Sequence, residues 1–169
     1  MQLRVLDIAP WRALSECYQY RANIDYAGLD LHAHGPHVTR IGDITAMPYE
    51  ADDFDAVVCI HVLEHIEADR LAISEIYRVL KPGGWAVIAV PIRMDQPTYE
   101  DPSITDPAER KIAFGERNHV RYYGADFADR LEAAGFRVKI DLGSDLPDET
   151  CRRHGLRKSE TIFHCIKPD

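Results

Sequence analysis

Short apolar runs rich in β-branched residues alternate along this chain with segments whose apolar residues recur at helical spacing. The clearest unit, residues 55–91, has an apolar run at 56–60, a helical pattern at 66–80 and a second apolar run at 85–90. Lys-Pro-Gly-Gly at 81–84 ends the helical pattern, because proline cannot continue a helix and glycine tolerates the turn. Two buried strands joined by a helix run parallel, so this unit predicts a βαβ crossover.

The rest of the chain shows the same two patterns. Further strands are expected at residues 3–8, 24–31, 38–41, 136–142 and 160–167. Further helices are expected at residues 11–20, 107–114 and 125–134. Strands that alternate with helices predict an α/β protein with a doubly wound, mostly parallel sheet.

Size and composition narrow the class of protein. A length of 169 residues fits one domain, residues 1–169, because a single core serves a chain of this size. No apolar run approaches the roughly 18 residues of a membrane span, and the N-terminal residues lack the pattern of a secretory signal. The four cysteines form no Cys-x-x-Cys pair, which favours reduced thiols and a cytoplasmic protein. The net charge of −8 argues against a nucleic-acid partner, because such binding depends on neutralising phosphates.

Residues 52–66 read DDFDAVVCIHVLEHI, and residues 75–91 read EIYRVLKPGGWAVIAVP. Together they resemble the middle of a class I S-adenosylmethionine (SAM)-dependent methyltransferase similar to methyltransferase type 11. The resemblance extends over residues 3–167 and implies a Rossmann-like, seven-stranded sheet whose last strand is antiparallel, inserted between the fifth and sixth. It also implies SAM as the cofactor and S-adenosylhomocysteine (SAH) as its product.

The resemblance also identifies what this sequence lacks. Most members have one or two helices before the first strand that cover SAM, whereas here the first strand is expected to begin at residue 3. The fold is therefore expected to be truncated at the N-terminus. Either the cofactor site is open, or a homodimer or a partner subunit covers it.

The turn after the first expected strand departs from the family pattern. Where most members have an acidic residue and then Gly-x-Gly-x-Gly, this chain has Asp7 followed by Ala9-Pro10. Pro10 has no N–H and a fixed φ, but SAM has no pyrophosphate and partly relaxes the need for a close backbone approach. The resemblance implies that Asp7, Ala9 and Pro10 border the cofactor. Arg12 is expected either to bind the methionine carboxylate of SAM or to lie on the solvated surface.

Two acidic residues at strand ends are expected to bind the nucleoside part of SAM. Asp30 ends the second strand, beside Leu31, where a carboxylate accepts hydrogen bonds from ribose hydroxyls. The resemblance implies that Asp43 accepts from the adenine amine and that the backbone N–H of Ile44 donates to the adenine ring. A plain Asx-turn at Asp43 is the alternative.

Histidines are the candidates for proton transfer. The resemblance implies that His61 lines the path of the methyl group beside the cofactor. Methyl transfer is an in-line displacement that depends on alignment, and a hydroxyl acceptor also needs a base, which a neutral histidine supplies at about pH 7. His119 and His61 are the expected catalytic residues, with His65 third. An amine or carboxylate acceptor would need no strong base, and the sequence does not choose between these acceptors.

Residues 92–124 are expected to form a lid that binds the acceptor, since a long insert after the fifth strand is more often a lid than filler. The expected acceptor contacts are His65, Arg93, Arg121 and Tyr122. The alternatives are an ion pair that holds the loop at Arg121 and a structural hydrogen bond at His119. The segment also resembles a bacterial sub-group associated with polysaccharide gene clusters.

Three histidines lie close together after the second expected strand. His32, His34 and His37 have no carboxylate or thiolate set at ligand spacing, and Gly35 and Pro36 separate them. We therefore expect a loop of solvated histidines and no metal site.

The combined features predict a SAM-dependent methyltransferase that acts on a small-molecule or saccharide-type acceptor. A SAM- or SAH-binding module without catalysis, such as a partner subunit, is the alternative favoured by the unusual turn at Ala9-Pro10. A nicotinamide-dependent oxidoreductase would use Asp30 equally well. The absence of Gly-x-Gly-x-x-Gly after the first strand counts against it.

Overall fold

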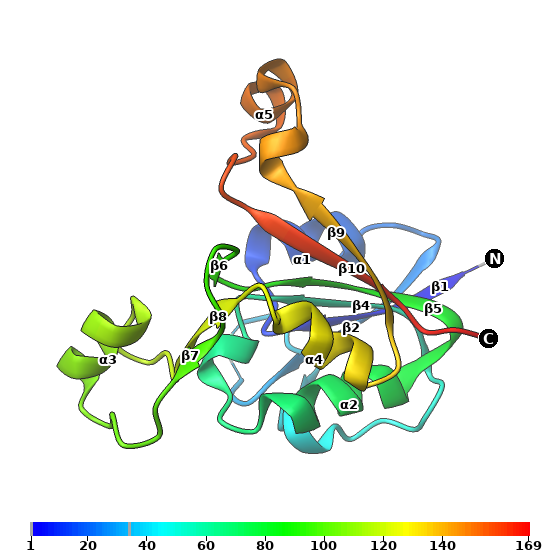
Figure 1. Ribbon diagram of the computed structural model, residues 1–169. Helices are drawn as coiled ribbons and strands as arrows, with labels where there is room; N and C mark the ends of the chain where they lie inside the picture. The colour runs from blue at the N-terminus through cyan, green and yellow to red at the C-terminus, as the bar shows by residue number, and fades with distance from the viewer. Residues whose placement is uncertain (1, 34) are drawn as a thin grey trace.

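The computed structural model describes residues 2–33 and 35–169. It contains a seven-stranded sheet of order β3-β2-β1-β4-β5-β10-β9 (Figure 1). The strands are β1 (Leu3–Ile8), β2 (Ile24–Asp30), β3 (Arg40–Ile41), β4 (Phe54–Ile60), β5 (Leu80–Ala89), β9 (Arg137–Leu142) and β10 (Thr161–Ile166). The strands from β3 to β5 pair in parallel, and β10 is antiparallel to both β5 and β9. The predicted Rossmann-like sheet, with its last strand inserted antiparallel, is confirmed.

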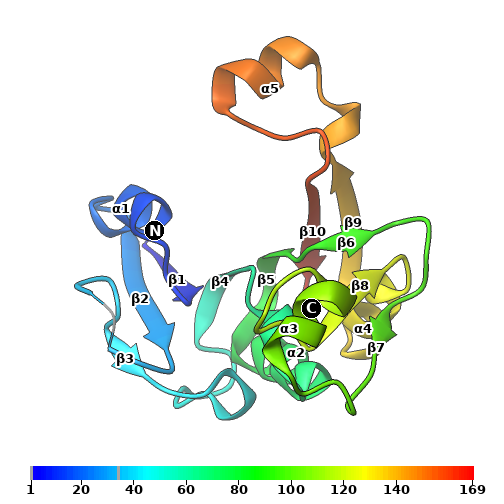
Figure 2. The same cartoon turned by 90° about the vertical axis from the view of Figure 1, so that its left-hand side faces the viewer.

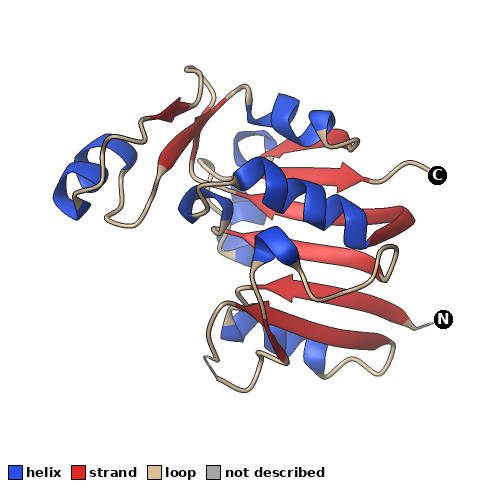
Figure 3. Cartoon of the chain, turned by 90° about the horizontal axis from the view of Figure 1, so that it is seen from below, coloured by secondary structure: helices blue, strands red, loops and turns tan. Residues whose placement is uncertain are grey.

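Helices lie on both faces of the sheet. The helices α2 (Asp69–Val79) and α4 (Phe127–Ala133) cover one face, and α1 (Arg12–Gln19) lies on the other (Figure 3). Between α4 and the sheet, the rings of Phe127 and Phe163 meet edge to face, with centroids 4.9 Å apart and both side chains fully buried. Burying a side chain of this kind contributes about 1.5–3 kcal/mol, so this contact fixes α4 on β10.

The segment 92–124 folds as a separate small layer at the carboxyl edge of the main sheet. Its strands β6 (Ile92–Arg93), β7 (Tyr99–Glu100) and β8 (Arg121–Gly124) form a sheet of order β6-β8-β7. The helix α3 (Pro107–Phe114) has the predicted bounds and begins at a cap, since the Asp106 carboxylate accepts from two backbone N–H groups. The sequence did not predict the three strands, because runs of two to four residues carry no periodicity.

Two other local expectations need correction. The Lys-Pro-Gly-Gly segment does not form a separate turn before the strand, because β5 already begins at Leu80, directly after α2. Gly84 is required there, since a Cβ atom would lie 2.8 Å from the carbonyl oxygen of Lys81. The residues between β9 and β10, for which the sequence predicted no helix, form the short helices η3 (Gly143–Asp145) and α5 (Asp148–His154) on an arm that projects from the sheet (Figure 2).

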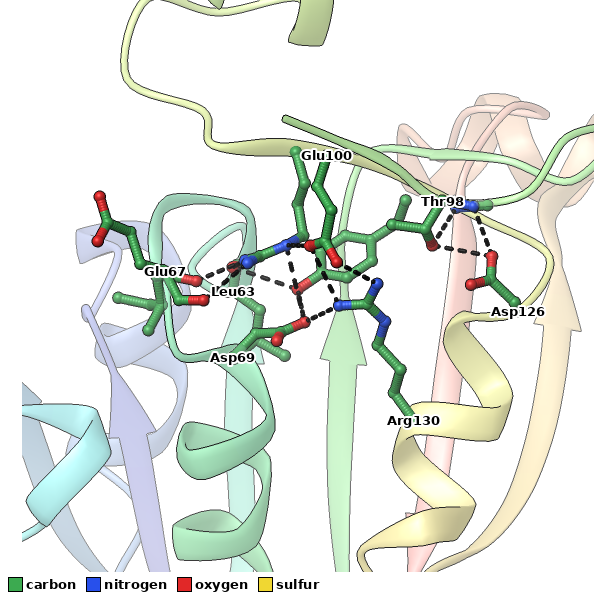
Figure 4. A network of polar contacts seen from close by, with 11 residues as sticks. Leu63, Glu67, Asp69, Thr98, Glu100, Asp126 and Arg130 are labelled. Atoms are coloured by element: carbon green, nitrogen blue, oxygen red, sulfur yellow. Dashed lines mark hydrogen bonds and ion pairs between the residues drawn. The ribbon is translucent and has the colours of Figure 1, made fainter. Parts of the chain in front are cut away.

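A buried network of charges connects the small layer to the main sheet (Figure 4). Arg121 of β8 and Arg130 of α4 are both buried, and each forms an ion pair with Asp69 and Glu100. Arg121 also donates to the backbone carbonyls of Leu63, Ile66 and Glu67. Burial alone would raise the pKa of Glu100, but the hydrogen bonds from the two arginines hold it below its usual value. The network thus joins α2, α4, β7 and β8 to the turn that follows β4.

Loss of Arg121 should destabilise the fold severely. Arg121→Ala is expected to lower the free energy of unfolding by about 3–5 kcal/mol, because it removes one charge from a largely buried ion-pair network and leaves the carbonyls of Ile66 and Glu67 without the donors that Arg121 supplies. Urea denaturation measures the change. The control Arg117→Ala removes an exposed arginine from the same segment and should stay within about 0.5 kcal/mol of the parent. A loss of similar size in both variants would contradict the role of the network.

Candidate functional site

The carboxyl ends of β1 and β4 lie side by side where the strand order reverses, which is where open α/β sheets bind ligands. Ala9 follows β1 and His61 follows β4, and both adopt left-handed backbone conformations, with φ of 51° and 55°. A non-glycine residue in this region costs about 1–2 kcal/mol. Hydrogen bonds hold both residues, from Ala9 N–H to the Leu29 carbonyl and from His61 N–H to the Ala89 carbonyl. Strain is therefore concentrated at the expected cofactor edge.

A cavity of about 350 Å³ opens beside Ala9. It brings together five residues that the sequence predicted for cofactor binding: Ala9, Asp30, Leu31, Asp43 and Ile44. It is completed by apolar and polar residues from β1, β2 and the turn after β4: Ile8, Leu29, Thr45, Val62, His65, Ile66, Glu67 and Ala68. Its walls are mainly apolar, and its two aspartates come from the ends of neighbouring strands.

The two aspartates differ in the number of hydrogen bonds that their carboxylates already accept. Asp30 accepts one hydrogen bond, from the backbone N–H of His32 at 3.0 Å. Asp43 caps the short helix η1 (Ile44–Ala46), because its Oδ1 accepts from the N–H and the hydroxyl of Thr45 at 2.8 and 2.7 Å. Those bonds hold the pKa of Asp43 below its usual value. The Asx alternative at Asp43 is therefore present, and it uses one of the two carboxylate oxygens.

The hydrogen-bond acceptors of the cavity fit the adenosine part of SAM. A ribose diol and an adenine amine donate hydrogen bonds, and two carboxylates accept them, while apolar side chains such as Leu29 and Ile8 suit the faces of the ring. The roles of the single residues in holding the cofactor remain predictions.

Asp7 lies deeper than the other expected cofactor residues. Its side chain is buried, and its carboxylate accepts from the hydroxyls of Ser15 at 2.9 Å and Tyr26 at 3.3 Å. Burial raises the pKa of Asp7 despite these bonds. Asp7 therefore attaches α1 to β1 and β2. It also lines a smaller cavity of about 190 Å³ that shares Ala9 with the first, so its predicted cofactor role stays a prediction.

The remaining residues of this turn lie nearer the surface. Pro10 directly precedes Trp11, the N-cap residue of α1, and its contact with the cofactor stays a prediction. Arg12 is exposed and forms an ion pair with Glu16 at 2.9 Å, one helical turn away. The surface alternative for Arg12 is thus the one that the structure shows.

The largest cavity described has a volume of about 480 Å³. It shares Trp11 and Ile60 with the small cavity at Asp7. The ends of β4 and β5 form its floor, and the arm between β9 and β10 forms its wall, with mostly apolar lining residues. They are Trp11, Ile60, His61, Ala89, Asp141, Leu142, Gly143, Leu146, Leu156, Arg157, Glu160 and Ile162. No motif in the sequence of this arm indicated a function. The only signal was the presence of Leu142, Leu146 and Leu156 in an otherwise polar segment.

The three candidate histidines lie together. His61, His65 and His119 line a fourth space, of about 370 Å³, with Glu64 and Pro91. The rings of His65 and His119 meet edge to face with centroids 4.8 Å apart. His61 Nδ1 lies 3.4 Å from Glu64 Oε1, and this contact raises the pKa of His61 although burial opposes it. The structure therefore places the three expected proton-transfer residues along one space. Which of them accepts the proton stays a prediction.

The residues of the small layer that were expected to contact the acceptor already contact one another or other parts of the protein. The Arg93 guanidinium lies 4.2 Å from the centre of the Tyr122 ring, on the paired strands β6 and β8. For Arg121 the ion-pair alternative is observed, since four of its hydrogen bonds go to Glu100 and to backbone carbonyls. Direct contact of Arg93, Tyr122 or Arg121 with an acceptor stays a prediction.

Neither His32 nor His37 lines the space of the three candidate histidines. His37 is buried and its Nδ1 lies 2.7 Å from Gln19 Oε1, so the expectation of a solvated histidine is wrong for this residue, whereas His32 is exposed. His34 lies outside the described residues.

Comparison with known proteins agrees with this geometry. Residues 12–88 match the family described as a methyltransferase domain. The chain is 33% identical over 112 residues to a sterol 24-C-methyltransferase of Debaryomyces hansenii, covering 64% of this chain and 28% of that one. It is 32% identical over 105 residues to a demethylmenaquinone methyltransferase of Renibacterium salmoninarum, covering 57% of this chain and 43% of that one. The matched stretch thus spans less than half of each relative.

A solved structure shares the fold. The phosphoethanolamine N-methyltransferase 2 of Haemonchus contortus, in complex with S-adenosyl-L-methionine, superposes with a TM-score of 0.64. The match covers all of this chain and 49% of that chain, at 15% sequence identity.

The strain at Ala9 gives a prediction about stability. Ala9→Gly should raise the free energy of unfolding by up to about 1 kcal/mol, because glycine adopts a positive φ without a Cβ clash. The matched change Ala13→Gly, in the first turn of α1, should lower it by about 0.5–1 kcal/mol. Thermal and urea unfolding measure both. The same sign in both variants would contradict the strained turn.

Proposed function

We propose that this chain belongs to the SAM-dependent methyltransferase family and is an enzyme that transfers a methyl group from SAM to a small molecule. SAM is the cofactor of that family. The relatives are longer than the stretch that this chain matches, so the activity and the acceptor are proposed for this protein on its own features.

The observation that supports this function best is the continuity of the cavities along the carboxyl edge of the sheet. The cavity with Asp30 and Asp43 shares Ile8 and Ala9 with the small cavity above Asp7. The small cavity in turn shares Trp11 and Ile60 with the large apolar cavity. A nucleoside held at Asp30 therefore has a path for its methionine end toward the large cavity, where an acceptor would lie.

The residues along this path support a simple mechanism. SAM supplies an electrophilic methyl group with a good leaving group, so the protein chiefly has to align donor and acceptor. Asp30 and Asp43 would orient the nucleoside, and Ala9 and Ile60 would border the connecting passage. His61 lines both the large cavity and the histidine cluster, which suits a residue that takes a proton from a hydroxyl acceptor.

The lining of the large cavity supports an acceptor with an apolar body. Leu142, Leu146 and Leu156 face it together with Trp11, and a saccharide would find few hydrogen-bond partners there. Two of the relatives are named for a sterol and for demethylmenaquinone. Of the two acceptor classes expected from the sequence, we therefore favour the non-saccharide small molecule.

The wider context of the site is also part of the proposal. We propose one domain, residues 1–169, with residues 92–124 as a lid, a second copy or a partner subunit over the cofactor, and a cytoplasmic location. No helix among residues 2–33 and 35–169 has the length and apolar character needed to cross a membrane. The four cysteines are free, and Cys59, Cys151 and Cys165 are buried, as reduced packed thiols would be.

Calorimetric titration tests the cofactor. We expect the protein to bind SAM and SAH and not NAD. Asp30→Asn should weaken SAM binding by about 1–3 kcal/mol, because the ribose diol loses a charged acceptor. The control Asp95→Asn changes an exposed aspartate of the lid and should leave the affinity unchanged. Tight binding of NAD without SAM would refute the proposal, and equal affinity of Asp30→Asn and the parent would remove Asp30 from the site.

Methyl-labelled SAM and small-molecule extracts test the acceptor. We expect label in the fraction that partitions into organic solvent. Leu146→Trp should block the large cavity and reduce this transfer at least about tenfold, the scale of a lost positioning contact, without changing SAM affinity. Leu71→Trp, on the exposed side of α2, is the control. Label only in polar products would contradict the apolar acceptor, and SAM binding without any transfer would favour the non-catalytic module.

A further inference from the structure

Three side chains with lone pairs converge beside the cofactor cavity. Glu64 and His65 lie in the short helix η2 (Leu63–His65) after β4, and His119 lies two residues before β8. Their carboxylate and ring-nitrogen atoms all lie within 4.8 Å of one another. Glu64 and His119 are 1% and 6% exposed, whereas His65 faces solvent. The set is thus partly enclosed and open on one side.

The hydrogen bonds of the two histidines define which ring nitrogen remains available. His119 Nδ1 lies 3.1 Å from the carbonyl oxygen of Phe114, and His65 Nδ1 lies 3.3 Å from the carbonyl oxygen of Asn118. A carbonyl oxygen only accepts, so each Nδ1 carries the proton. In the neutral rings both Nε2 atoms then keep a lone pair, which is the arrangement that metal-binding histidines commonly have.

The carboxylate of Glu64 has an unused oxygen. Its Oε1 faces His61, but its Oε2 is buried and has no hydrogen-bond partner among the described residues. A buried carboxylate oxygen without a partner is unfavourable, because it has lost its contact with water. Two imidazoles and this carboxylate therefore lie close together, and a cation would compensate the carboxylate oxygen that has no donor among the described residues.

The backbone holds the two segments of the cluster in register. Val120 N–H donates to the Glu64 carbonyl at 2.9 Å, so the residue after His119 is bonded to the middle of the η2 turn. Arg121 holds the same turn through the carbonyls of Leu63 and Ile66. The three side chains are therefore carried on a frame that the buried charge network fixes, as a preorganised site requires.

We propose that Glu64, His65 and His119 bind a divalent transition-metal ion. Two ligand atoms of one ion lie at most about 4.4 Å apart, since metal–nitrogen and metal–oxygen distances are about 2.0–2.2 Å. The ligand atoms here lie within 4.8 Å of one another, so the side chains have to move closer together when the ion binds. Two nitrogens and one oxygen suit Zn²⁺, Mn²⁺, Fe²⁺ or Co²⁺ better than Mg²⁺. This site departs from the sequence-based expectation of no metal.

The ion would lie where it acts on the acceptor. His65 lines both the cofactor cavity and the space around the cluster, and three protein ligands leave coordination positions open toward that space. An acceptor hydroxyl bound there would have a lowered pKa and would lose its proton to water or to a base. Its oxygen would then form the bond to the methyl carbon as the carbon–sulfur bond breaks and sulfur keeps the electron pair. This role rests on the proposed function, whereas binding of the ion does not.

Metal titration of the purified full chain tests the site. After treatment with a chelator, the protein is titrated with Zn²⁺, Mn²⁺ and Mg²⁺ by calorimetry and with Co²⁺ by visible absorption. We expect one Zn²⁺ and one Co²⁺ per chain, bound more tightly than Mg²⁺. Glu64→Gln keeps the shape of the side chain, and His119→Gln keeps a polar one; each should weaken Zn²⁺ binding at least about tenfold. Circular dichroism checks that both variants are folded.

Two controls separate this site from others. Glu116→Gln changes a carboxylate that lines the same space outside the proposed ligand set, and His154→Gln changes an exposed histidine on α5; both should bind Zn²⁺ like the parent. Equal Zn²⁺ affinity in the parent and in folded Glu64→Gln would overturn the proposal. SAM binding is measured on the same samples. SAM binding without a metal site refutes only the metal proposal, and a metal site without SAM binding refutes only the proposed function.

Discussion

The buried charge network of Arg121, Arg130, Asp69 and Glu100 is the interaction on which the functional edge depends. Its two cations and two anions balance in charge, and because Arg121, Arg130 and Asp69 are buried while Glu100 is partly exposed, removing one of the buried partners is costly. The network joins α2 and α4 to the small layer that carries β7 and β8. Because Arg121 also binds the carbonyls of the turn after β4, the same network sets the positions of Glu64 and His65 relative to His119.

The carboxyl edge of the main sheet combines two strained turns with the cavities that lie beside them. Ala9 and His61 hold left-handed conformations at the ends of neighbouring strands, where a glycine would be expected. Ala9 lines the cavity of Asp30 and Asp43, and His61 lines the apolar cavity under the arm of α5. The spaces proposed for donor and acceptor are thus each bordered by one of these strained turns, which agrees with a reaction whose main requirement is alignment.

Much of the fold could be predicted because it rests on local patterns. The β1, α3 and β10 segments were found within a residue of their bounds, since apolar periodicity and capping residues mark them. The strands of the small layer and the α5 helix were missed. They are short and polar, and they are held by contacts with distant residues, as when the Thr98 N–H donates to the Asp126 carboxylate.

The residues of the candidate site could also be predicted only in part. Asp30 and Asp43 could be placed from the sequence, because parallel neighbouring strands end at one edge and their terminal residues must share it. By itself, the sequence therefore determined the sheet, the family resemblance and the two aspartates that we propose for the nucleoside. Only the tertiary structure decided that His119 meets His65, that Arg121 is a buried anchor and that Leu146 and Leu156 wall a cavity. These residues are far apart in the chain, and no local pattern specifies which distant segment each one contacts.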